Sequence, residues 1–182
     1  PCQPSDLKPL LNMRASQLSL TGPACVQVGM NCIAPTEDSA YFMSSRLPLP
    51  DHRVYAVVGA LGTQTGNATY VGLGLNVSTT QLGFDNIEDH NLAGTANRYA
   101  AVPSHERFFL QYFARDCTDL EDLTAGSNCY SIGDQLPNCY DPTDPTCAML
   151  VLSVRNYLFP SSQRGPAPEF TLNPVIITLH KP

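Results

Sequence analysis

The chain has 182 residues, a formal net charge of −6 and 14% charged residues. This length supports one domain with a hydrophobic core of its own. An acidic surface attracts neither nucleic-acid backbones nor anionic membranes, so both are excluded as expected partners. The longest apolar run, residues 147–152, is far shorter than the ~20 residues that span a bilayer, and no membrane span is expected.

The N-terminal part is rich in proline. The chain begins at Pro1 with no apolar leader, which fits a mature exported product or a trimmed chain. Residues 1–23 are interpreted as a Pro-rich segment that precedes the main domain. Within it, residues 5–17 are the best helix candidate, with Ser5 as the cap and Pro9 restricting where the helix begins.

The rest of the chain is divided by turn residues into short strand-like runs. These runs cover residues 24–34, 39–46, 53–61, 70–78, 107–115, 149–159 and 174–180. Several short strands with few helices are typical of a sandwich or a Greek-key barrel. The sequence therefore predicts an all-β fold, an antiparallel β-sandwich or Greek-key barrel with a loop-rich insertion and at most one short helix.

Residues 70–78 form the clearest strand. Val71, Leu73, Leu75 and Val77 fall on one face, while Asn76 falls on the other, as in a half-buried strand. The glycine-containing loop 62–66 separates this run from residues 53–61, and such a spacing predicts a β-hairpin.

The domain itself is expected to cover residues 24–172, with residues 118–146 as an acidic, cysteine-containing surface insertion. Six of the seven cysteines are disulfide candidates: Cys25, Cys32, Cys117, Cys129, Cys139 and Cys147. The last four bracket or lie within the insertion and allow three pairings, among which the sequence does not choose. Cys25 and Cys32 are close enough to pair across a tight hairpin, which leaves Cys2 free, bonded to another molecule, or paired with one of them.

Two N-glycosylation sequons begin at Asn67 and Asn76. Disulfides persist in oxidising compartments, and sequons are used only in the secretory pathway. Together they favour a secreted, extracellular or cell-surface glycoprotein, with covalent N-glycans at these two positions. Asn76 would carry its glycan on the outer face of the 70–78 strand.

No metal, cofactor or catalytic motif stands out. At least six residues separate neighbouring cysteines, so the paired spacing of zinc sites is absent. Residues 85–91 and 141–144 are rich in oxygen donors, which leaves a weak possibility of calcium, but solvated turns explain them better. Sugar-binding sites use exposed aromatic rings, usually Trp, and the chain has no Trp. Tyr55 and Tyr70 are candidates to line one sheet face, but the sequence favours ordinary half-buried strand tyrosines at both positions.

Residues 173–182 contain a terminal strand whose apolar residues are Val175, Ile176, Ile177 and Leu179. This strand either closes its own domain or inserts into the sheet of a neighbouring copy. Exchange between copies would make a head-to-tail polymer. It also predicts that a chain ending at Leu172 stays a soluble monomer.

Three function classes remain open. The sequence favours a non-enzymatic extracellular structural or adhesive glycoprotein that self-assembles into polymers or filaments, with copies of itself as partners. The second class is a secreted carbohydrate- or protein-binding β-sandwich module. The third is a secreted hydrolase whose site is assembled from dispersed residues.

Overall fold

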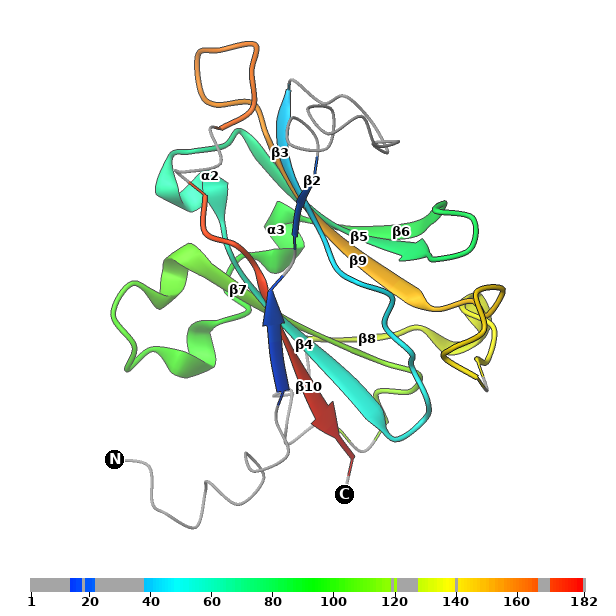
Figure 1. Ribbon diagram of the computed structural model, residues 1–182. Coiled ribbons are helices and arrows are strands. Elements are labelled where there is room, and N and C mark those ends of the chain that lie inside the picture. Colours follow the sequence, from blue (N-terminus) through cyan, green and yellow to red (C-terminus); the bar gives the residue numbers. More distant parts are fainter. Residues whose placement is uncertain are drawn as a thin grey trace.

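The computed structural model describes residues 14–17, 19–21, 38–118, 120, 128–139, 141–166 and 171–181. Over these residues the chain forms two five-stranded β-sheets that enclose a common core (Figure 1). Sheet A has the spatial order β1 (Arg14–Gln17), β10 (Val175–His180), β4 (Arg53–Ala60), β7 (Phe108–Ala114) and β8 (Cys129–Ser131). Sheet B has the order β2 (Ser19–Thr21), β3 (Ser39–Met43), β9 (Leu150–Tyr157), β5 (Tyr70–Val77) and β6 (Gly83–Glu88).

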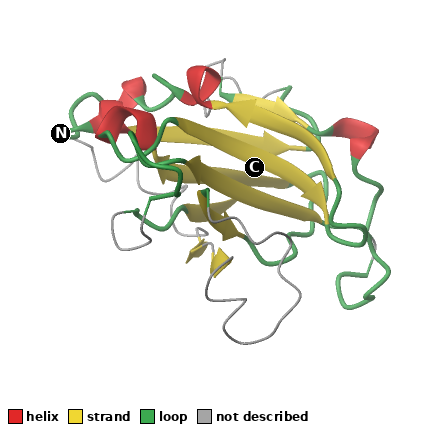
Figure 2. Ribbon diagram, turned by 90° about the horizontal axis from the view of Figure 1, so that it is seen from above, coloured by secondary structure: helices red, strands yellow, loops and turns green. Residues whose placement is uncertain are grey.

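The predicted all-β sandwich is confirmed. Neighbouring strands are antiparallel, except that β8 runs parallel to β7. Among the described residues the helices are α2 (Gly62–Thr65) and α3 (Asp89–Leu92), each a single turn, with 3₁₀ turns at Asn97–Tyr99, His105–Arg107 and Gly133–Gln135. That is one helix more than the sequence led us to expect, and the helices lie toward the periphery of the sheets (Figure 2). No helix in the described part of the chain is long and apolar enough to cross a membrane.

The core is built by alternation along the strands. On β5, Val71, Leu73 and Leu75 are completely buried, as predicted, and Val77 packs against the same cluster. Sheet A contributes fully buried aromatic residues to it, including Phe109 and Phe113 of β7. Burying side chains of this size stabilises the fold by roughly 1.5–3 kcal/mol each.

The predicted hairpin between the 53–61 and 70–78 runs is wrong. β4 lies in sheet A and β5 lies in sheet B, and residues 62–65 form α2 between them. Gly66 ends this helix in the left-handed conformation, with φ of 76°, and its N–H donates to the Gly62 carbonyl oxygen. Both edges of β4 are taken by β10 and β7, so β5 has no place beside it.

The N-terminal helix prediction is also corrected. Residues 14–17 of the 5–17 candidate form β1, which pairs with β10, and residues 5–13 lie outside the described part of the chain. β2 follows and pairs with β3 of sheet B. Two strands that occur before residue 24 therefore extend the two sheets, and the sequence pattern did not reveal them because each has only three or four residues. The strand predicted over residues 24–34 lies outside the described residues.

The terminal strand closes its own domain in this structure. β10 lies between β1 and β4 and is hydrogen-bonded to both (Figure 1, red arrow). Ile176 is buried in the common core. Val175, Ile177 and Leu179 are half-buried, and the last two pack against a second apolar cluster that includes Val54 and Leu110.

Two disulfides fasten the insertion. Cys117 is bonded to Cys129 and Cys139 to Cys147, so of the three open pairings the structure has the sequential one. Within the insertion, β8 adds a short strand to sheet A. Cys2, Cys25 and Cys32, with the pairings considered for them, lie outside the described residues.

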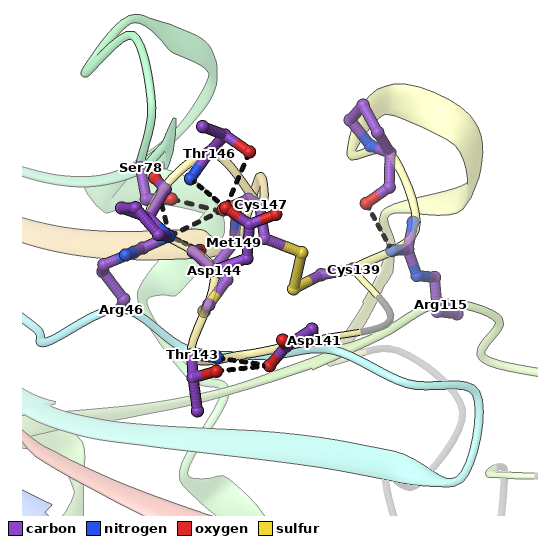
Figure 3. The surroundings of a disulfide bond; sticks show 12 residues. Arg46, Ser78, Arg115, Cys139, Asp141, Thr143, Asp144, Thr146, Cys147 and Met149 are labelled. Carbon is purple, nitrogen blue, oxygen red and sulfur yellow. Dashed lines mark hydrogen bonds between the residues drawn. A yellow bond between two sulfur atoms is a disulfide. The ribbon is translucent and has the colours of Figure 1, made fainter.

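The second disulfide loop is rigidified by repeated turns (Figure 3). The Asp141 carboxylate accepts hydrogen bonds from the backbone and hydroxyl of Thr143, and Asp144 does the same with Thr146. These bonds lower the pKa of both carboxyl groups. Arg46 donates to three carbonyl oxygens of the same loop, which ties it to the sheet.

Candidate binding site

The outer face of sheet B carries polar and glycine residues because the apolar residues of its central strands point inward. On β5, the positions between the buried ones are Gly72, Gly74 and Asn76. On β9, the side chains of Leu152 and Val154 are buried in the core. Arg155 follows Val154, so its side chain is on the outer face of the sheet. Strand register then places Arg155 opposite Gly72 and, on its other side, opposite Tyr41 of β3.

A hollow of about 300 Å³ lies on this face, and we call it the polar groove. It is lined by residues of four adjacent strands: Tyr41, Tyr70, Gly72, Gly74, Asn76, Gly83, Asp85, Asn86, Ser153, Arg155 and Tyr157. Its volume lies at the lower end of the range for small-molecule sites, which runs from roughly 300 to 1,000 Å³. The groove is open to one side of the sandwich and does not extend into the core.

Glycines form the floor of the polar groove. A Cβ atom at Gly74 would come within 2.7 Å of the Ser153 Oγ, and one at Gly72 within 2.9 Å of the Asn86 Oδ1. Glycine weakens a strand interior and often marks a site that another molecule approaches closely. Glycine at these two central positions of β5 therefore leaves room for the Ser153 and Asn86 side chains, which pack over the strand at the bottom of the groove.

Tyrosine rings form the wall of the groove. The Tyr70 and Tyr157 ring centroids are 5.5 Å apart and tilted by 58°. The Tyr70 hydroxyl accepts a hydrogen bond of 2.9 Å from the Asn86 side-chain amide, which fixes both side chains. Each ring has an apolar face and a polar tip, so this wall offers both stacking and hydrogen bonding.

Arg155 lies among these tyrosines. Its guanidinium carbon is 4.7 Å from the centroid of the Tyr41 ring and 5.1 Å from that of Tyr157. Its Nη1 donates a hydrogen bond to the Tyr157 hydroxyl. The ring faces attract the cation and hold it in the groove.

Asp85 is at the opposite edge of the groove and is already engaged. Its Oδ1 accepts a hydrogen bond of 2.7 Å from the Asn86 N–H, and its Oδ2 accepts one from the Tyr130 hydroxyl of β8. Partial burial and this carboxylate raise the pKa of Tyr130, which therefore remains a donor at neutral pH. The Tyr130–Asp85 bond connects the two sheets at this end.

A second hollow, of about 270 Å³, adjoins the first at Asn76, which lines both. It is also lined by residues of β3, of the segment that follows β3 and of the turn after β5, including Met43, Arg46 and Gln81. The two hollows together follow the sheet face, which suits an extended ligand better than a compact one.

Tyr55 and Tyr70, the two candidates for one sheet face, lie in different places in the structure. Tyr55 is buried in the common core, where its hydroxyl donates to the Pro48 carbonyl oxygen at 2.6 Å. Tyr70 is in the polar groove. Tyr41, Arg155 and Tyr157 were missed, although the alternation of Leu150, Leu152 and Val154 with polar residues in the 149–159 run was a signal for the last two.

The two oxygen-rich segments have other partners. In the 85–91 segment, residues 83–88 form β6, Asp85 bonds to Tyr130, and Glu88 lies 3.4 Å from the His90 ring nitrogen. In the 141–144 segment, the carboxylates accept hydrogen bonds from their own turns. Among the described residues, no group of three or more His, Cys, Asp or Glu side chains is arranged to hold a metal ion.

Comparison with known proteins gives no match: no family model, no curated protein and no solved structure is similar to this chain. The lining of the polar groove has hydroxyl, amide and guanidinium groups and aromatic rings, with Asp85 as its carboxylate. Such a set binds polar ligands; a pair of carboxylates on either side of a bond, as glycosidases use, is not among the lining residues.

The two sequons differ in their surroundings. Asn67 follows the helix α2, outside the polar groove, and its N–H donates to the Gly62 carbonyl oxygen. Asn76 is on the outer face of β5, as predicted, but its Nδ2 donates to the Val151 carbonyl oxygen at 3.2 Å and to the Ser153 Oγ at 3.1 Å. A glycan would replace one of the two hydrogens that make these bonds.

We therefore expect Asn67 to be modified and Asn76 to be unmodified in folded protein secreted by eukaryotic cells. Glycopeptide mass spectrometry measures the occupancy of each site. An Asn67→Gln variant is the control and should lose essentially all glycan mass. Substantial occupancy at Asn76 in folded material would contradict the expectation and would put a glycan in the groove.

Proposed function

We propose that this chain is an extracellular, non-enzymatic binding module whose polar groove takes a saccharide chain. The observation that carries the proposal is the combination of a glycine floor with a tyrosine wall on an open sheet face. Sugar rings present apolar faces that stack on aromatic rings and hydroxyl groups that exchange hydrogen bonds with amides and carboxylates.

Several features support this reading. Asn86 and Asp85 supply hydrogen-bonding groups on the β6 side. The two adjoining hollows suit an extended chain. Two disulfides and two sequons fit an oxidising, extracellular location.

The test is a glycan array, followed by affinity measurements on three tyrosine variants. Tyr70→Ala is expected to weaken binding by about 10-fold, since an aromatic contact contributes roughly 0.5–1.5 kcal/mol beyond its area burial. Tyr70→Phe keeps the ring and should stay within about 3-fold of the parent affinity. Tyr99→Ala, an exposed tyrosine outside the groove, is the matched control and should change nothing.

Absence of any glycan ligand up to millimolar concentrations would overturn the proposal. Equal affinity of the parent and the folded Tyr70→Ala variant would place the ligand elsewhere on the molecule.

A second candidate function is self-assembly by exchange of β10 between copies, which would make the protein a structural or adhesive polymer. The observation that favours it is the position of β10, a terminal strand between β1 and β4. An equivalent strand from a neighbour would restore the same hydrogen bonds and the same buried Ile176 contact. The shortened chain described in the Discussion tests it.

A further inference from the structure

We propose that the saccharide bound in the polar groove carries one carboxylate, as a uronic acid does, and that Arg155 binds it. This inference rests on the proposed function and names the ligand class for the same site. It starts from a difference between Arg155 and Arg115, both of which are half-buried.

Arg115, which is half-buried, and Arg46, which is exposed, each donate to three or more backbone carbonyl oxygens, and those contacts explain why arginine is present there. Arg155 is half-buried as well, yet among the described residues it makes a single hydrogen bond, to the Tyr157 hydroxyl. The ion pairs found in the described part of the chain involve His90, His105 and Arg107, and none includes Arg155. Within the described part of the chain, its charge is therefore unmatched by a carboxylate.

A guanidinium has five N–H donors in a rigid planar fork. One of them is used by Tyr157, and the flanking rings of Tyr41 and Tyr157 hold the group in place. A pre-organised fork with unused donors matches the two oxygens of a carboxylate. Partial removal from water makes such a charge-assisted pair stronger than the same pair on an exposed surface.

The rest of the groove limits the ligand to one negative charge near Arg155. Asp85 lines the opposite edge, and Glu88 on the same strand is paired across the sheet with Gly72, which lies opposite Arg155. The whole chain carries a net charge of −6. These carboxylates would repel a polyanion. A saccharide with a single acidic group would instead place its hydroxyl groups beside them.

The experiment compares oligosaccharides that differ at one position, glucuronic acid against glucose and galacturonic acid against galactose, by calorimetry with the full chain. The acidic member of each pair is expected to bind about 10-fold or more tightly, because hydrogen bonds to charged groups are stronger than neutral ones. Arg155→Met should abolish this preference and leave the neutral sugar within about 3-fold. Arg155→Lys should retain only part of it, since an ammonium lacks the fork.

Arg107→Met, at an exposed arginine outside the groove, is the matched control and should keep the full preference. Equal binding of acidic and neutral sugars by the parent protein would overturn the inference while leaving the saccharide site intact. Binding of neither would overturn the proposed function itself. Tighter binding of a sulfated analogue than of the uronic acid would show that the carboxylate assignment is wrong. The comparison of acidic with neutral sugars on the unaltered protein tests the inference even if Arg155→Met does not fold.

Discussion

A chain that ends at Leu172 is expected to lose cooperative folding. Removing β10 leaves the edges of β1 and β4 without partners and takes Ile176 out of the core. The loss of one such buried side chain costs about 2–5 kcal/mol, and the lost sheet pairing adds to it. Whole domains have only about 5–15 kcal/mol of stability, so the shortened chain should be mostly unfolded.

This result differs from the soluble monomer that strand exchange predicted from the sequence alone. The reason is that β10 occupies an interior position in sheet A and is not an addition to its edge. Circular dichroism during thermal unfolding is the direct measurement. A melting transition like that of the full chain would contradict the placement of β10.

The same shortened chain tests self-assembly. A synthetic peptide of residues 173–182 is expected to restore the folded state when added in trans, because it replaces the missing strand. A peptide with Ile176→Asp is the matched control and should fail, since a charge would enter the core. Light scattering on the full chain then decides whether copies exchange the strand: a monodisperse monomer at high concentration rules exchange out.

The second large effect is expected at Arg115, which connects β7 to the residues that close one end of the core. Its Nε donates to the Leu49 carbonyl oxygen at 2.9 Å, and its Nη1 donates to Gly133 at 2.8 Å and also to Leu136. Its Nη2 donates to Pro137 at 3.0 Å. Figure 3 shows one of these bonds.

Removing the guanidinium leaves several carbonyl oxygens without a donor and frees a segment whose Ile132 and Leu136 side chains are buried. Arg115→Ala is therefore expected to lower the free energy of unfolding by about 2–4 kcal/mol, measured by urea denaturation. Arg115→Lys should lower the free energy of unfolding by only about half as much as Arg115→Ala, because a lysine reaches some but not all of these oxygens.

Arg107→Ala is the matched control for Arg115, because it removes an exposed arginine, and it should stay within about 0.5 kcal/mol. If Arg115→Ala unfolds at the same urea concentration as this control, the carbonyl contacts contribute nothing to stability. If Arg115→Ala lowers both the urea midpoint and the dependence of the free energy of unfolding on urea concentration, the 132–137 segment unfolds separately from the rest of the domain.

The fold class and most strands followed from local patterns. The 70–78 run is the plainest case, since alternation alone identified the residues that β5 buries. Short or polar strands are not evident from the sequence: residues 85–91, which include most of β6, are predicted to be a solvated turn because Asp and Asn, as at Asp85 and Asn86, are turn formers. β8 has three residues inside an acidic segment, and it forms because β7 and the Cys117–Cys129 disulfide hold it in place.

The polar groove illustrates the limit of local pattern. Tyr41, Tyr70 and Arg155 belong to three strands, and their proximity depends on β9 lying between β3 and β5. A strand's sequence indicates which side chains share a face but not which strand will be its neighbour, because backbone hydrogen bonds are the same for every partner. The hairpin predicted between β4 and β5 was wrong for this reason.

By itself, the sequence determined the class of fold and the buried face of its best strand, and it supplied the cysteines and sequons on which the proposal of an extracellular location rests. These properties are local, since alternation and tripeptide motifs are read within a few residues. Only the tertiary structure decided the pairing of the four insertion cysteines, the interior place of β10 and the assembly of the polar groove. It also gave the two sequons different surroundings, because Asn76 lies against β9, more than seventy residues away in the chain, whereas Asn67 lies at the end of a local turn.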